Sequence, residues 1–363
     1  MHLKTSLAYI KGHPLTALLA ALPLALWAEA GHWGAVWVFV FSAVGIIPLA
    51  EYIGEATEAL AAYTSPRMGG LLNATLGNAA ELIITIVAIR EGLLDLVKAS
   101  ITGSILGNLL LVMGMSFLLG GLKNGLQRFE QRNATRNAIL LVLAVLALLI
   151  PSLLSHSIGP DGSPRVETLS LGVAGVMVVL YALALLYSFR SEGEPLAHRP
   201  QAGDVSREPD WSLRKAVVIL ALSTLGVVIA SEFLVGAVEP VVSGLGISEF
   251  FLGVILIPIV GNVAEHLVAV EMAIANKMEL SVEIAIASSL QIALFVAPVL
   301  VFVSLLMGNP LQLIFNQFEL LALVAGVVIV ALVSADGESN WLEGTELLAV
   351  YLIIALAFFL LPT

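Results

Sequence analysis

Apolar residues are gathered along the chain into long windows separated by short polar stretches. A helix needs about 20 apolar residues to cross the hydrocarbon core of a bilayer, and lipid offers no partner to the backbone of an open strand edge. The pattern therefore predicts an all-α membrane protein with eleven transmembrane helices. The windows are 14–30, 33–60, 68–90, 96–120, 137–155, 166–189, 213–238, 249–274, 281–307, 311–334 and 342–361.

The composition agrees with this class. The 363 residues are 59% hydrophobic and 12% charged, with a mean hydropathy of +1.00, whereas soluble domains have about 25% charged residues. A net charge of −11 offers no attraction to nucleic acid. The chain has no cysteine, which excludes a disulfide framework and a thiolate metal site. A soluble enzyme, a nucleic-acid-binding protein and a disordered scaffold are all disfavoured.

Lys and Arg residues indicate the orientation, because cytoplasmic loops carry the excess of positive charge. With the N-terminus in the cytoplasm, only Arg90, Lys98 and Arg165 fall outside, and an odd number of spans places the C-terminus outside. The first window follows Lys4 and Lys11 and resembles a signal peptide, but we expect it to be retained as an accessory helix. The protein is expected to cross the membrane of a prokaryotic cell several times.

Three segments of the chain occur twice in the same order. This recurrence indicates an internal repeat of the structure. The pairs are Gly77–Glu81 (GNAAE) with Gly261–Glu265 (GNVAE) at an offset of 184, Glu51–Glu58 with Glu232–Glu239 at an offset of 181, and Gly103–Gly107 with Ala287–Gln291.

The repeat and one polar linker divide the chain into four parts. Each repeat holds five spans, an odd number, so the second enters the membrane from the opposite side. Inverted repeats of this kind are typical of transporters that hold their substrate near the membrane midplane and work by alternating access. The expected parts are an accessory first helix at 1–31, a first five-helix repeat at 32–189, a cytoplasmic linker at 190–212 and a second five-helix repeat at 213–363.

The repeated motif places an acid and an amide deep in the membrane in each half. Glu81 is thirteen residues into its window, which corresponds to a depth of about 20 Å. Asn78 lies three residues earlier and therefore on the same helix face, and Glu265 and Asn262 repeat the arrangement. Carboxylate and amide oxygens are hard ligands that suit Ca²⁺ rather than a soft metal.

Glycine precedes each of these acids. We expect Gly77 and Gly261, the latter helped by Pro258, to loosen the helix just before the Glu and free backbone carbonyls for an ion. The alternative is a pair of protonated carboxyls kept for packing. A carboxylate at the bilayer centre costs several kcal/mol, so its occurrence in both repeats favours a function.

Other polar residues of these windows are expected either at the ion site, where the repeat matches them, or in helix packing. Ser104, Ser288 and Gln291 are expected at the site, whereas Ser289, Asn108 and His266 are expected to serve helix packing. Acids on the preceding windows have two interpretations, namely acidic gates or proton relays on the ion path, or solvated helix ends. These acids are Glu58, Glu232 and Glu239, with Glu51 and Glu55 ranked lower.

The chain has no nucleotide-binding or hydrolase motif, and no loop is long enough for a catalytic domain, so we expect a protein that is not an enzyme. An intramembrane enzyme would also need a nucleophile with a base in reach. A cation channel built on the same acids remains an alternative. One GxxxG pair, Gly103 and Gly107, leaves a homo-oligomer open. The acidic loop Asp336–Glu346 is interpreted as a solvated turn.

Five segments together resemble the calcium/proton exchangers, a branch of the calcium/cation antiporter superfamily. The resemblance implies one extra helix plus two inverted five-helix units, and Ca²⁺ extrusion or sequestration driven by inward proton movement. Ca²⁺ is then a transported substrate, and no cofactor is implied. The segments are GGLLNATLGNAAELI at 69–83, GSILGNLLLVMG at 103–114, GNVAEH at 261–266, ASSLQIALFVAP at 287–298 and DGESNWLEG at 336–344.

The resemblance also implies roles for single residues. Glu81 and Glu265 would be the central ion-binding acids, and Glu58 and Glu232 would serve gating and proton coupling. The linker lacks a continuous acidic run, which argues against cytosolic Ca²⁺ regulation of the family type. The residues implied to complete the ion cage are Asn78, Asn262, Ser104, Ser288, Gln291 and the backbone of Gly77 and Gly261.

The hypothesis for the mechanism is competition of Ca²⁺ and protons for Glu81 and Glu265. Two bare anions in a poorly solvated pocket repel each other, so the site is expected to hold either the metal ion or protons. A sodium-coupled exchanger is the alternative within the transporter class. Its repeats usually carry small hydroxyl residues and Pro around the Glu, where this chain has Asn and Ala.

Overall fold

The computed structural model of the protein describes residues 14–160, 162–190 and 211–361. Lys4, Lys11 and most of the expected linker 190–212 lie outside the described residues. The described part is almost entirely helical, apart from two short strands and the connecting segments. The first half contains η1 (Pro14–Ala20), α2 (Ala21–Ala30), α3 (Ala35–Ala62), α4 (Pro66–Leu76), α5 (Ala79–Arg90), α6 (Leu94–Leu106), η2 (Gly107–Val112), α7 (Met113–Asn124), β1 (Gln127–Arg128), α8 (Gln131–Ile158) and α9 (Pro164–Arg190).

The second half has a similar make-up. It contains α10 (Leu213–Gly236), α11 (Val238–Leu245), α12 (Glu249–Phe251), η3 (Leu252–Leu256), α13 (Ile257–Ile274), α14 (Met278–Gln291), η4 (Ile292–Val296), α15 (Ala297–Met307), α16 (Gln317–Val333), β2 (Glu338–Ser339) and α17 (Trp341–Phe359).

Eight helical segments of the described chain are long and apolar enough to cross a membrane. Two shorter apolar helices, Leu15–Ala30 and Gln317–Val333, coincide with two further predicted windows. Large apolar side chains remain exposed along several of these helices, for example Leu306 at 88% and Leu332 at 70%. Because a soluble surface of this kind would associate, these faces are those expected to meet lipid. The protein is therefore an all-α membrane protein.

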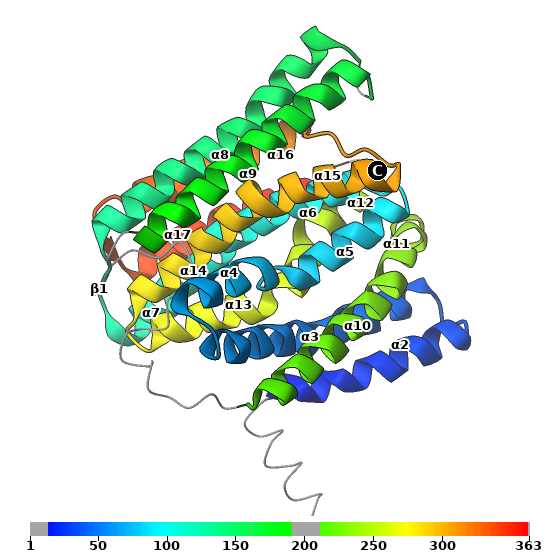
Figure 1. Cartoon of the computed structure of the whole chain (residues 1–363), viewed down its shortest axis with the longest axis horizontal. Helices are drawn as coiled ribbons and strands as arrows, with labels where there is room; N and C mark the ends of the chain where they lie inside the picture. The colour runs from blue at the N-terminus through cyan, green and yellow to red at the C-terminus, as the bar shows by residue number, and fades with distance from the viewer. Residues whose placement is uncertain (1–13, 161, 191–210, 362–363) are drawn as a thin grey trace, which may run out of the picture.

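The helices form a bundle in which the long axes run in one general direction (Figure 1). The α8–α9 pair lies along one edge, and α3 packs with α10 at the opposite edge. Between these edges lie α5 and α13, which carry the two GNxAE motifs. Both motifs are thus placed in the interior of the bundle and not at its lipid-facing rim.

The predicted helical window 311–334 is wrong over its first six residues. Residues 311–316 are extended, and Leu311, Leu313 and Phe315 are buried at every second position. Their backbone N–H groups donate to three serine hydroxyls, those of Ser304 (2.7 Å), Ser170 (3.0 Å) and Ser152 (3.0 Å) respectively. An extended segment is tolerated at this depth because its polar backbone groups find partners inside the protein.

The helix after this segment begins at a well-formed cap. The Asn316 side chain accepts from the backbone of Phe318 and Glu319, and the Glu319 carboxylate accepts from the Asn316 N–H at 2.8 Å. This reciprocal capping box is a strong start signal for a helix. The apolar run alone predicts a helix over the whole window, and the cap shows that the helix begins at Gln317.

The acidic loop Asp336–Glu346 is part of a small structural unit. Strands β1 and β2 pair antiparallel, with Arg128 opposite Glu338, and the two side chains form an ion pair at 3.0 Å. Gln127 also donates to the Ala273 carbonyl at 3.0 Å. Asn340 and Glu343 then form a second capping box at the start of α17. The loop is therefore tied to β1 and leads directly into α17.

Wide π-helical turns lie between α6 and α7 (η2), between α12 and α13 (η3) and between α14 and α15 (η4). Two of them, η3 and η4, precede Pro258 and Pro298 by two residues. Proline has no N–H to give to the carbonyl four residues earlier and its ring crowds that group, which is Val254 for Pro258. The Val254 carbonyl lies against Gly103 of α6, where a side chain would collide with it. Gly103 is thus required for α6 to approach the Pro258 region.

We predict that Gly103→Ala destabilises the protein. The added methyl would lie against the Val254 carbonyl oxygen and 2.7 Å from the Pro258 ring, and overpacking of this kind costs about 1–3 kcal/mol or more. Thermal unfolding of the purified protein in detergent measures the loss. Gly107→Ala is the matched control, since nothing lies within 4 Å of a Cβ at Gly107. Equal melting temperatures of the two variants would contradict the argument.

Candidate functional site

The first GNxAE motif interrupts a transmembrane window. Helix α4 ends at Leu76 and α5 begins at Ala79, so Gly77 and Asn78 lie between two helix segments. The expected loosening at Gly77 is confirmed. Asn78 precedes α5 without capping it and instead donates its Nδ2 to Gln291 Oε1 at 2.7 Å. Glu81 falls in the first turn of α5, where the positive end of the helix dipole favours a negative charge.

The second motif does not interrupt its helix. Helix α13 runs unbroken from Ile257 to Ile274 through Gly261 and Glu265, so the expected loosening at Gly261 is wrong. The irregular stretch is the π-helical turn η3, which ends just before Pro258. Pro258 causes this irregular stretch, because its missing N–H is accommodated by the π-helical turn before it. Gly261 instead allows α13 to lie close to Glu81.

Glu81 is 1% exposed and is surrounded by polar partners from other helices. Its carboxylate accepts a hydrogen bond from the Ser104 hydroxyl of α6 and a longer one from Asn262 Nδ2 of α13 at 3.4 Å. Asn262 also reaches Ser104 Oγ at 3.2 Å and the Pro258 carbonyl at 3.1 Å. Residues from both halves of the chain therefore contact one buried carboxylate.

Glu265 has the corresponding serine partner. The Ser288 hydroxyl of α14 donates to Glu265 Oε2 at 2.6 Å. In both cases the serine follows the acid by 23 residues. Ser104 and Ser288, which the repeat matches to each other, thus make the same hydrogen bond to the acid of their own half.

The two halves approach each other at the motif glycines. A Cβ built on Gly77 would lie 3.1 Å from Glu265 Oε1, and one built on Gly261 would lie 3.5 Å from the Cβ of Glu81. Each glycine therefore faces the acid of the other half.

Oxygen atoms dominate this group of side chains, which we call the central cluster: Asn78, Glu81, Ser104, Asn262, Glu265, Ser288 and Gln291. Asn78 is 1% exposed, and its Oδ1 is buried without a hydrogen-bond partner among the described residues. An unsatisfied buried acceptor costs about 1–3 kcal/mol, and a hard cation would satisfy it. The described residues contain no group of three His, Cys, Asp or Glu side chains that could hold a metal ion, so a cation here would depend on amide, hydroxyl or backbone oxygens beside the two carboxylates.

The two acids differ in their access to solvent. Glu81 is buried, whereas Glu265 is partly exposed.

The predicted gating acids lie outside the central cluster. Glu58 on α3 and Glu239 on α11 are exposed. Glu232 on α10 binds Arg90 at the end of α5 through two hydrogen bonds, one of them 2.7 Å between Arg90 Nη1 and Glu232 Oε1. The sequence indicates Arg90 only as a positive charge on the outer side, and nothing in the sequence links this position to Glu232.

His266 and Asn108 form a further buried contact beside the cluster. His266 Nε2 lies 3.1 Å from Asn108 Oδ1, between α13 and η2. Ser289 donates to the Ala285 carbonyl of its own helix at 2.9 Å. These three residues were expected to serve packing, and their contacts agree with that expectation.

These features define a class: a helical membrane protein with two carboxylates in an oxygen-rich cluster between its halves. Residues 34–190 and 215–360 match the family described as sodium/calcium exchanger protein. A Ca²⁺/H⁺ antiporter of Aphanothece halophytica is 45% identical over 357 residues, which cover 95% of this chain and 96% of the relative. The chain belongs to the sodium/calcium exchanger family.

Further relatives support this assignment. The Ca²⁺/H⁺ antiporter ChaA of Bacillus subtilis strain 168 is 44% identical over 344 residues, which cover 94% of this chain and 97% of the relative. The solved structure of native YfkE is 43% identical with a TM-score of 0.83, covering 96% of this chain and all of that one (100%). The resemblance to the exchangers is confirmed, and the two curated relatives are antiporters rather than enzymes.

We predict that Asn78 and Gln291 are energetically coupled. Asn78→Ala and Gln291→Ala each leave a partner unsatisfied at a cost of about 1–3 kcal/mol, so the double variant should lose about 0.5–3 kcal/mol less than the sum. Thermal unfolding in detergent measures the loss of stability in each single variant and in the double variant. Thr75→Ala is the control, because its hydroxyl bonds the Leu71 carbonyl of its own helix, and its effect should add to that of Gln291→Ala. Additive losses for Asn78 and Gln291 would refute the coupling.

Proposed function

We propose that the protein is a secondary active antiporter that exchanges Ca²⁺ for H⁺ across a membrane. The observation that carries the proposal is the equivalent Ser–Glu hydrogen bond in each half, with each acid approached by a glycine of the other half. Relatives named Ca²⁺/H⁺ antiporters that cover nearly the whole chain support the choice of ions. Ca²⁺ is the substrate, and the protein needs no resident metal for this role.

In this proposal Glu81 and Glu265 bind Ca²⁺ directly. Ca²⁺ takes six to eight oxygen ligands in a flexible geometry, so two carboxylates need further oxygens. The unpartnered Asn78 Oδ1 is the strongest candidate for an additional ligand. The remaining candidates are Asn262, Ser104, Ser288, Gln291 and the backbone of Gly77 and Gly261.

The same carboxylates would carry the protons. Without Ca²⁺, two ionised acids in the protein interior repel each other and lack water, so protonation is favoured and the pair titrates as one unit. Only the Ca²⁺-bound and the protonated forms are free of uncompensated buried charge. Movement between the two membrane sides is then restricted to those forms, which makes the exchange obligatory.

The hydroxyl donors fit this role. In the ionised state Ser104 and Ser288 donate to Glu81 and Glu265, and each hydroxyl oxygen can instead turn a lone pair toward a cation. Asn262 Nδ2 near Glu81 likewise helps to compensate the charge while no metal ion is bound. These groups can therefore exchange partners without a large change of the backbone.

The architecture proposed with this mechanism is eleven transmembrane helices, one extra helix at 1–31 and two inverted five-helix repeats at 32–189 and 213–363 around the linker 190–212. The equal 23-residue spacing of the two Ser–Glu pairs supports the repeat. The π-helical turns η2 and η4 support it as well, since each begins three or four residues after the serine of its half. The distribution of Lys and Arg supports a cytoplasmic N-terminus and an outside C-terminus.

Gating is assigned to acids on the helices before each motif, Glu58, Glu232 and Glu239. The ion pair of Glu232 with Arg90 ties α10 to the end of α5, the helix that carries Glu81 in its first turn. Separation of this pair would let the two helices move apart.

We predict that Glu81→Gln and Glu265→Gln each abolish exchange and leave the fold intact. Glutamine keeps the shape of the side chain but can neither neutralise Ca²⁺ nor release a proton. Proteoliposomes with an internal pH dye report Ca²⁺-driven proton flux, and size-exclusion chromatography reports folding. Glu271→Gln, at an exposed position of the same helix as Glu265, is the control and should retain wild-type flux. Normal flux in either central variant would exclude the shared-site mechanism.

A second prediction separates proton from sodium coupling. An imposed pH gradient should drive ⁴⁵Ca²⁺ uptake equally with and without Na⁺. The apparent Ca²⁺ affinity should fall as the pH falls, by about tenfold per pH unit for each proton displaced, because metal binding must expel protons from its ligands. Uptake that requires Na⁺ would instead favour a sodium-coupled exchanger, and unitary currents in planar bilayers would favour a channel.

A further inference from the structure

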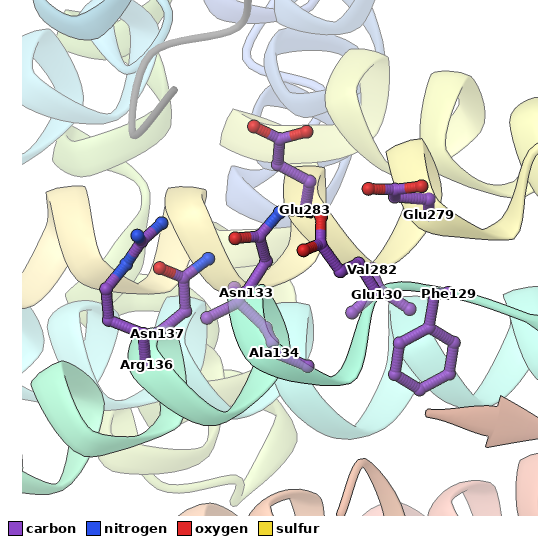
Figure 2. Close-up of a pocket in the computed structure, with 10 residues that line it drawn as sticks. Phe129, Glu130, Asn133, Ala134, Arg136, Asn137, Glu279, Val282 and Glu283 are labelled. Atoms are coloured by element: carbon purple, nitrogen blue, oxygen red, sulfur yellow. Dashed lines mark hydrogen bonds between the residues drawn. The ribbon is translucent and has the colours of Figure 1, made fainter. Parts of the chain in front are cut away.

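A second group of oxygen ligands lies away from the central cluster, in a cavity of about 30 Å³ between α8 and α14 (Figure 2). The cavity is about the size of one water molecule or one metal ion. Its polar lining consists of Glu130, Asn133, Arg136, Asn137, Glu279 and Glu283. We call it the α8–α14 cavity.

The lining is organised as two facing pairs. Asn133 and Asn137 lie four residues apart on α8, and Glu279 and Glu283 lie four residues apart on α14. Residues at this spacing share one helix face. Figure 2 shows Asn133 and Asn137 on α8, with Glu279 and Glu283 on the neighbouring α14. Two carboxylate residues and two amide residues thus line one cavity at the interface of α8 and α14.

The amide oxygens of this cavity lack partners. Asn137 is only 5% exposed, and its Oδ1 has no hydrogen-bond partner in the described part of the chain. The same holds for Asn133 Oδ1, while Asn133 Nδ2 donates to Glu130 Oε2 at 2.8 Å. Buried polar atoms are nearly always satisfied in native proteins. Two unsatisfied oxygens in one small cavity therefore point to a ligand that accepts lone pairs.

The charges lead to the same conclusion. Glu279 and Glu283 are like charges four residues apart, an arrangement that destabilises a helix unless a cation compensates it. Glu283 is partly buried, Glu279 and Glu130 are exposed, and Arg136 contributes the positive charge of the lining. With Glu130 the lining carries three carboxylates against one guanidinium, so a net negative charge remains.

We propose that the α8–α14 cavity binds a Ca²⁺ ion through Glu279, Glu283 and the side-chain oxygens of Asn133 and Asn137. These are hard oxygen ligands, and water would complete the six to eight positions that Ca²⁺ requires. Since no three acidic or imidazole side chains of the described residues are gathered closely enough to hold a metal ion, the amides are essential to the site. Soft metals are disfavoured by the same ligands.

Such an ion would join α8 to the helix that supplies the central cluster. Ser288 and Gln291 lie on α14 five and eight residues after Glu283, about 7 and 12 Å along the axis. Fixing the start of α14 against α8 would restrict the movement of both residues. This link to transport rests on the proposed function. The cavity lies at the end of the bundle assigned to the cytoplasm, so the site would respond to cytosolic Ca²⁺.

The test measures ⁴⁵Ca²⁺ binding to the full-length protein in detergent with the central acids removed by Glu81→Gln and Glu265→Gln. This background is expected to bind one Ca²⁺ per chain. Adding Glu279→Gln and Glu283→Gln should weaken binding at least tenfold, whereas adding Glu271→Gln, an exposed acid near the same end, should not. No binding in the background, or unchanged binding after the Glu279 and Glu283 substitutions, overturns the proposal.

A second variant covers the case in which the glutamine substitutions disturb folding. In the same background Asn137→Leu should keep or raise the melting temperature without Ca²⁺, because an apolar group replaces an unsatisfied one, but should lose the Ca²⁺-induced rise. An unchanged rise would overturn the site. The result is independent of the proposed function: if the central acids do not bind Ca²⁺, the background binds as much as the wild type, and the effect of the cavity substitutions is still measured.

Discussion

The structure depends on how two acidic side chains are held inside a membrane protein. An isolated carboxylate cannot remain ionised in such a place, so each acid needs polar partners that are already in position. Glu81 and Glu265 each receive a serine hydroxyl from the neighbouring helix of their own half. The remaining compensation must be supplied by a cation or a proton, and this is what links burial to transport.

Glycine and proline create the geometry around these acids. At Gly77 and Gly261 the absence of a side chain lets each half reach the acid of the other. Pro258 withholds an N–H from the Val254 carbonyl, and Gly103 accommodates that carbonyl against α6. The close packing of the halves therefore results from a few positions where backbone meets backbone or backbone meets carboxylate.

The two halves are similar without being equal. Glu81 is buried in the first turn of a separate helix, whereas Glu265 is partly exposed within a continuous one. His266 contacts Asn108 in the interior. The matching positions of the repeat, 184 residues away, are the apolar residues Leu82 and Ile292. The first half also ends its motif helix with Arg90, which holds Glu232. Two equal halves would exchange conformations with no preference, and differences of this kind set which conformation is favoured.

The sequence by itself determined the class, the helical windows and the repeated acids, because hydropathy over 20 residues and a motif at a fixed offset are local signals. It also located the break at Gly77, where a flexible residue precedes a helix start. It could not determine that residues 311–316 are extended, since their N–H groups are satisfied by Ser152, Ser170 and Ser304 of other helices. Likewise the unbroken helix at Gly261, the pair Arg90–Glu232 and the α8–α14 cavity depend on contacts between residues far apart in the chain, which only the tertiary structure decides.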